Sequence, residues 1–188
     1  SSLRQLSLKF PQGDFSDLKW SLPALINLNV EFQYEADYGS MFRLPRIEAP
    51  SLQHVTIPDR LETSGAMLTE LMDSVRDGQL RSLQMIDFDN EQQSGQIPQE
   101  QIARFLQSLL KKQYSSLTCL KLSPWLELCP QMLPSLAQLT QLEELTATLL
   151  YSSSTPVLLA RLFGALPRLR CAEVHPVYAD EDEVEAEV

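Results

Sequence analysis

The histidines and cysteines are the side chains of this sequence best suited to chemistry, because imidazole and thiolate groups bind metals and act as bases or nucleophiles. The chain contains two histidines, His54 and His175, and three cysteines, Cys119, Cys129 and Cys171. No Cys-x-x-Cys pair, His-Glu-x-x-His motif, Gly-x-Ser-x-Gly elbow or phosphate-binding glycine loop accompanies them. Whether any two of these groups can act together depends on the elements that carry them.

An internal repeat organises the chain. The pattern Leu-x-x-Leu-x-Leu, with conservative replacements, occurs seven times, starting at Leu3, Leu25, Leu52, Leu80, Leu117, Leu142 and Leu169. Successive starts are 22, 27, 28, 37, 25 and 27 residues apart, which is typical of leucine-rich repeats. One or two copies would arise by chance in a leucine-rich chain, but seven in near register would not. The sequence therefore predicts an α/β leucine-rich-repeat solenoid, or horseshoe, over residues 1–178.

Each copy of the pattern predicts one short strand. The fourth and sixth positions point inward and the first fills the preceding turn, so each unit buries its leucines only against the next unit. We therefore expect a parallel sheet of about seven strands on the concave side, centred near residues 6, 28, 55, 83, 120, 145 and 172. The buried core should include Leu6, Leu28, Leu83, Leu120 and Leu145.

The segments between the strands are expected to form helices and irregular turns on the convex side. Apolar residues at helical spacing predict helices over residues 67–75, 102–110 and 157–166. Residues 14–22 and 130–139 are interpreted as short or irregular helices.

Two longer connections are predicted to be loops, over residues 34–45 and 87–101. The second makes the fourth unit 37 residues long. Such an insertion either contacts a partner or is tolerated surface length.

On such a sheet the candidate chemical groups lie far apart. His54 and His175 are four strand steps apart, about 19 Å, and cannot share a metal ion at a ligand distance of about 2 Å. Cys171 and His175 lie on one strand, about 13 Å apart, too far for a nucleophile and its base. We therefore expect no catalytic site, no metal and no cofactor, and interpret the chain as a non-enzyme.

The concave face is the predicted binding surface, because solenoids characteristically bind partners there. Its side chains are mostly short, polar and uncharged. A single residue on this face can simply be a solvated strand position, whereas the whole surface, roughly 30 Å long, can hold a protein segment. The central column, Asn29, Thr56, Gln84 and Lys121, should be exposed. The predicted partner-binding residues are Asn29, Glu31, His54, Thr56, Gln84, Lys121, Thr146 and Glu173.

Charge and cysteine usage narrow the partners and the compartment. The net charge is -10, and six acidic residues fall within residues 180–187. Nucleic-acid binding needs clustered basic residues, so neither a nucleic acid nor a membrane is an expected partner. Residues 179–188 are predicted to be a disordered acidic tail, because like charges repel and little apolar surface is available. Three cysteines without a disulfide pattern favour the cytoplasm or nucleus.

The strands are introduced by Leu-Pro-x-Leu at 22–25 and 166–169, or by Ala-Pro-Ser-Leu at 49–52. With the unit length and the irregular convex helices, these motifs resemble the leucine-rich-repeat region of F-box proteins, especially the degenerate fungal kind. The resemblance implies the substrate- or partner-recognition region of a ubiquitin ligase adaptor. The chain would then be the C-terminal part of a longer array and would join a ligase complex through a region before Ser1. The alternative is a repeat scaffold or GTPase regulator, similar to the acidic-tailed GTPase-activating protein for Ran.

Overall fold

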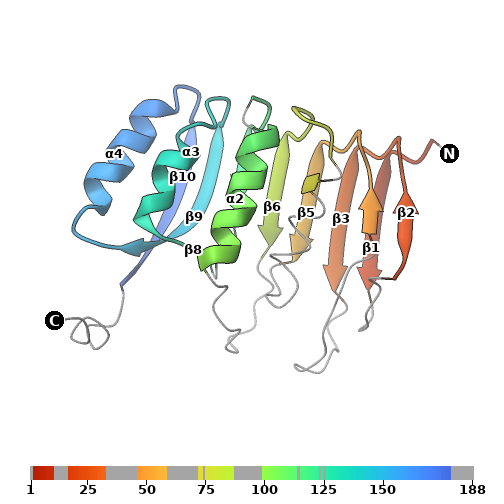
Figure 1. Ribbon diagram of the computed structural model, residues 1–188, viewed down its shortest axis with the longest axis horizontal. Coiled ribbons are helices and arrows are strands. Elements are labelled where there is room, and N and C mark those ends of the chain that lie inside the picture. The colour runs from red at the N-terminus through yellow and green to blue at the C-terminus, as the bar shows by residue number, and fades with distance from the viewer. Residues whose placement is uncertain are drawn as a thin grey trace.

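The structure is a computed structural model that describes residues 2–10, 17–32, 46–58, 72–73, 75–86, 99–113, 115–122, 124 and 126–178. These residues form an α/β fold around a parallel sheet whose strand order follows the order of the chain (Figure 1). The strands are β1 (Gln5–Phe10), β3 (Asn27–Phe32), β5 (His54–Pro58), β6 (Ser82–Ile86), β7 (Cys119–Lys121), β9 (Glu144–Tyr151) and β10 (Cys171–Tyr178), with β8 (Glu127–Leu128) beside β9. Every predicted strand centre lies inside one of these strands, and every pair is parallel, as predicted.

One face of the sheet is apolar because alternate strand residues point to the same side. Leu28, Leu83, Leu120 and Leu145 are each at most 2% exposed and belong to one continuous core. Leu6 pairs in register with Leu28, yet it is only partly buried. The prediction of a buried Leu6 was wrong because β1 is an edge strand and only one neighbour covers it.

Three helices cover this apolar face (Figure 1): α2 (Gln99–Gln113), α3 (Leu133–Leu136) and α4 (Thr155–Ala165). A 3-10 turn, η1 (Pro130–Met132), precedes α3, which confirms the short, irregular helix predicted there. α2 begins at Gln99, so the predicted loop over 87–101 ends earlier than expected, and residues 87–98 lie outside the described residues. None of the helices in the described part is long and apolar enough to cross a membrane.

The prediction of a helix over residues 14–22 was wrong in its described part. Strand β2 (Lys19–Ser21) lies there and pairs in parallel with β4 (Arg46–Glu48). Both strands alternate polar, apolar and polar residues, and their central residues, Trp20 and Ile47, face the core. Alternation of polar and apolar residues indicates a strand, but the indication is weak when the segment has only three residues. Lys19 also forms an ion pair with Glu48 at 2.7 Å.

Several expected elements fall outside the described residues, namely most of the helix predicted over 67–75, the loop over 34–45 and the tail over 179–188. The chain is described again from Val75, and Gly78 has a φ of 68°. A residue with a β-carbon adopts a positive φ of this size only at a cost in conformational free energy, so glycine suits this turn before β6.

A buried glutamine ties neighbouring units together at the end of α2. Gln113 is fully buried, and its Oε1 accepts a hydrogen bond from the Leu80 backbone N–H at 2.9 Å. Its Nε2 donates to the Arg76 carbonyl at 3.2 Å, and Ser116 Oγ donates to its Oε1 at 3.3 Å. The side chain thereby satisfies backbone groups of the turn before β6, which the helix itself cannot reach.

The last strand, β10, forms one edge of the sheet. Its Cys171 N–H donates to the Glu143 carbonyl beside β9 at 3.1 Å. Successive residues of a strand turn their N–H and C=O groups to opposite sides. Ala172, Val174 and Pro176 therefore point theirs to the free edge. Because proline has no N–H, this edge lacks one donor in the second half of the strand.

Candidate functional site

The face of the sheet turned away from α2, α3 and α4 is the candidate site, and we call it the open face. Its central row is held in register across all seven consecutive strands. Strands about 4.8 Å apart make this row roughly 30 Å long. It contains six of the eight predicted binding residues and one further serine: Ser7, Asn29, Thr56, Gln84, Lys121, Thr146 and Glu173.

The other two predicted residues lie on the open face beside this row. His54 belongs to the neighbouring row, two residues before Thr56, and is exposed. Glu31 lies two residues after Asn29, and its carboxylate accepts a hydrogen bond from Asn29 Nδ2 at 2.9 Å. The structure thus places all eight residues on one face but aligns only six of them.

The charged side chains of the open face are paired with one another. Lys121 Nζ lies 3.4 Å from Glu144 Oε2, and Lys9 Nζ lies 3.4 Å from Glu31 Oε2. These side chains remain between about a third and three quarters exposed. Exposed ion pairs of this kind contribute only about 0 to 1 kcal/mol. A partner can therefore exchange its own charged groups for them at little cost.

The neutral positions of the central row retain hydrogen-bonding capacity. In the described part of the chain, the side chains of Thr56 and Thr146 form no hydrogen bond and are partly exposed. Gln84 donates through Nε2 to Ser82 Oγ at 3.1 Å, and this leaves its amide oxygen available. The row therefore presents unused hydroxyl and carbonyl groups on a rigid backbone.

The four residues predicted to be exposed, Asn29, Thr56, Gln84 and Lys121, are only partly so. On a sheet, residues directly opposite each other have β-carbons about 4.5–5.5 Å apart, so neighbouring side chains shield one another. The prediction of their face was right and that of their exposure was too high.

Comparison of the chain with protein-family models, curated proteins and solved structures finds no match. The assignment of a role to the open face therefore rests on its own geometry.

The structure keeps the candidate chemical groups apart, as expected. His54 on β5 and His175 on β10 are separated by β6, β7 and β9. Within the described residues, no three His, Cys, Asp or Glu side chains form a group that could hold a metal ion. His175 instead lies 3.5 Å from the carboxylate of Glu173 on its own strand.

Cys119 lies in the row beside the central one, between Ser82 and Glu144. Gln84 Nε2 donates to its sulfur at 3.8 Å, and the thiol donates to Glu144 Oε2 at 3.6 Å. Burial is the main cause that raises the pKa of the Cys119 thiol, and the negative charge of Glu144 adds to the effect. The thiol is therefore held in its less reactive, protonated form.

This gives a test by alkylation. Iodoacetamide should modify Cys119 more slowly than the exposed Cys171 in the native protein, because the thiolate is the reacting species and burial also limits access. Mass spectrometry of tryptic peptides over a time course measures both rates. In denaturant the two rates should converge. A native rate for Cys119 equal to that for Cys171 would contradict the described environment.

Sequence reasoning missed the interruption between β7 and β8. Lys121 pairs with Thr146 and Glu127 with Thr148, so the pairing with β9 stops after Lys121 and resumes at Glu127, while β9 itself advances only from Thr146 to Thr148. Thr148 belongs to the open face by alternation, yet it is 2% exposed. Among the described residues, its hydroxyl finds no hydrogen-bond partner. Pro124, which cannot donate a hydrogen bond to a neighbouring strand, was the available signal in the sequence.

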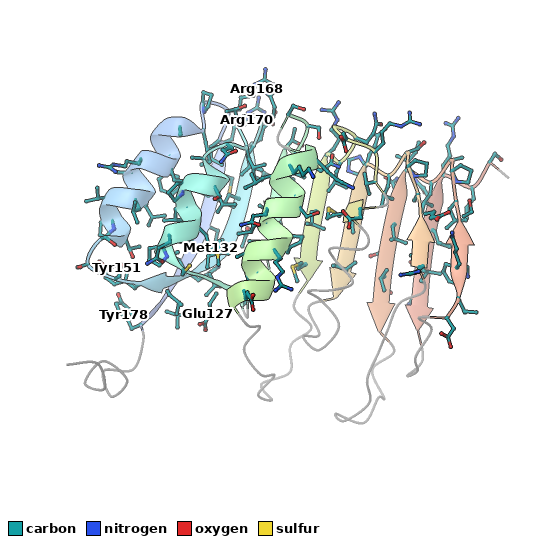
Figure 2. All side chains as sticks on the ribbon, viewed as in Figure 1. Glu127, Met132, Tyr151, Arg168, Arg170 and Tyr178 are labelled. Carbon is teal, nitrogen blue, oxygen red and sulfur yellow. The ribbon has the colours of Figure 1, made fainter. Side chains whose placement is uncertain are left out.

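Sequence reasoning also did not single out two groups of side chains at the C-terminal flank, which lie at opposite ends of the last strands (Figure 2). Arg168 and Arg170 lie where β10 begins, whereas Tyr151 and Tyr178 lie where β9 and β10 end. The two tyrosine rings are 5.1 Å apart between centroids. These groups lie outside the rows of the open face.

Proposed function

We propose that this chain is a leucine-rich-repeat solenoid that binds another protein through the open face, which would be the concave side. The central row is the observation that carries this proposal, because a row in register over seven parallel strands offers a long, preorganised surface. Its hydroxyl and amide groups are only partly used by neighbours. A partner that satisfies them gains hydrogen bonds without reordering the sheet.

The chemistry of the row indicates the kind of segment that fits. Five of its seven positions are neutral, and its lysine, Lys121, is already paired with Glu144 within the face. A polar polypeptide segment suits such a surface better than a strongly charged one, since the described lysines of the face, Lys9 and Lys121, already have carboxylate partners. This is consistent with a peptide-like partner and not with a phosphate backbone.

Within this class we propose the substrate-recognition region of an F-box-type ubiquitin ligase adaptor acting in the cytoplasm or nucleus. The Leu-Pro-x-Leu strand entries and the short, irregular α3 support the resemblance that suggests this role. The described cysteines, which are all free thiols, agree with a reducing compartment.

Binding is tested by capture from cell lysate with two open-face variants, Lys121→Glu and Thr56→Arg. Each should markedly reduce the capture of a protein that the unmodified chain retains, because one reverses a charge and the other adds bulk in the central row. Matched controls, Lys111→Glu and Gln107→Arg, make the same kinds of change at exposed positions of α2. Their capture should be unchanged, and all four variants should keep the melting temperature.

If both open-face variants retain the protein, the open face is not the binding surface, and the segment 87–101 becomes the next one to test. The adaptor role is tested separately on the captured protein. Overexpression of the 188-residue chain should lengthen the half-life of the captured protein in cells after protein synthesis is stopped. The reason is that the chain competes with the ligase adaptor for the captured protein. An unchanged half-life would leave binding in place and contradict the adaptor role.

A further inference from the structure

The charges of the open face are spread unevenly along the array. On β1 and β3, Lys9 lies beside Glu31 and the two charges balance. Over β7 to β10, Lys121 is the single lysine among the described residues of this face, and three carboxylates lie there: Glu127, Glu144 and Glu173. The half of the open face formed by β7 to β10 therefore has an excess of negative charge.

A buried hydroxyl without a hydrogen bond lies within this acidic region. Thr148 is in register with Glu127 on β8 and with His175 on β10, so the three side chains form a row across the open face. Thr148 is 2% exposed, and its Oγ1 finds no hydrogen-bond partner among the described residues. Buried polar groups are almost always paired, because leaving one unpaired costs free energy. The hydroxyl thus marks a place where an incoming donor would gain a hydrogen bond.

The side chain of His175, next to Thr148 in this row, makes a weak contact. It is 53% exposed, and its Nε2 lies 3.5 Å from Glu173 Oε1 on the same strand. A contact of this kind at an exposed position adds little stability, so the imidazole can turn aside at little cost. Glu173 then becomes available to another cation, close to the hydroxyl of Thr148.

The groups around the Thr148 hydroxyl are mainly hydrogen-bond acceptors. The α-carbons of Glu127 and Glu173 lie about 12 Å apart, on strands separated by β9. A guanidinium group offers five N–H donors in a flat fork and suits acceptors spread over such a distance, whereas an ammonium group donates from one point. A metal ion suits them less, because no cluster of three metal-ligating side chains occurs in the described part of the chain.

We propose that the open face binds an arginine of its protein partner between Glu127 and Glu173, with the Thr148 hydroxyl accepting one of its N–H groups. This proposal rests on the proposed function, because it names a residue of the partner that binds this face. It also orients the bound segment. The arginine lies over β8 to β10, and the neutral part of the segment lies over Thr56 and Gln84.

Titration of the isotope-labelled chain with N-acetyl-arginine amide, followed by NMR, tests the proposal. The backbone amide signals of Thr148 and Glu173 should shift along a saturable curve. N-acetyl-citrulline amide, which has nearly the same shape but no charge, should leave these signals in place at the same concentrations. Equal binding of the citrulline probe would overturn the proposal, and so would shifts spread over acidic residues of the whole surface.

Thr148→Val separates a ligand-binding hydroxyl from a structural one. Valine fills the same space without the unpaired oxygen, so the melting temperature should hold or rise, while binding of the arginine probe should weaken by about tenfold. Glu173→Gln should weaken it by up to about fivefold, and this variant alone decides if Thr148→Val does not fold. The matched control, Glu100→Gln on α2, removes an exposed carboxylate that pairs with Arg104 and should change nothing. Probe binding that either open-face variant leaves unchanged in a folded chain would overturn the proposal.

The proposed function and the arginine site fail in different experiments. The proposed function fails if Lys121→Glu and Thr56→Arg both retain the captured protein. The arginine site fails if the probe does not bind beside Thr148, even where those two variants lose the captured protein. Thr148→Val should also capture less of that protein at an unchanged or higher melting temperature. Full capture by this variant would overturn the arginine site and leave the proposed function in place.

Discussion

Replacing Leu120 with alanine is expected to lower the free energy of unfolding by about 2 to 5 kcal/mol. Leu120 is fully buried on β7, and it pairs in register with Leu83 on one side and Leu145 on the other. Its removal leaves a cavity in the middle of the sheet, where neither neighbouring strand can close in without breaking its own ladder. Urea or guanidinium denaturation, analysed with a common slope, measures the change.

The matched control is Val157→Ala in α4, because that side chain is 56% exposed. This change should alter stability by no more than about 0.5 kcal/mol, as is usual at the surface. A loss below about 1 kcal/mol for Leu120→Ala would mean that the core does not include this position.

Replacing Gln113 with leucine is the second change expected to have a large effect. The leucine fills nearly the same space but leaves the Leu80 N–H and the Arg76 carbonyl without their side-chain partners. Each buried group left unsatisfied costs about 1 to 3 kcal/mol. The loss should appear in denaturant melts and as faster hydrogen exchange of the Leu80 amide, which ordinary surface destabilisation would not produce.

Gln107→Leu is the control for this experiment, since it makes the same change at an exposed position of α2. Its free energy of unfolding should stay within about 0.5 kcal/mol of the unmodified chain. If Gln113→Leu is as mild, or if the Leu80 amide exchanges at its former rate, the buried glutamine does not stabilise the turn before β6.

The main sheet was predictable because its signal is repeated. A single Leu-x-x-Leu-x-Leu motif says little, but recurring copies fix both the strands and their parallel register. The short strands β2, β4 and β8 were not predicted, since two or three residues do not establish a period. Leu6 shows a different limit: the pattern reports which face a residue takes, whereas burial also depends on having a neighbour on both sides.

The candidate site was predictable to a similar depth. Alternation along the strands placed the eight binding residues on one face, but the ion pair of Lys121 with Glu144 depends on which residues of adjacent strands stand side by side. The link between Gln113 and the turn before β6 joins residues more than 30 positions apart. Such contacts follow from how units stack, which no local pattern specifies.

Pro176 has a consequence for how many molecules can join. Parallel repeat units present unlike ends, so stacking the end of one molecule on the start of the next could in principle continue without limit and build a filament. Growth of that kind requires the β10 edge to pair. The missing N–H of Pro176 removes one main-chain hydrogen bond from each such contact. One proline thus weakens the pairing of the β10 edge with any further parallel strand.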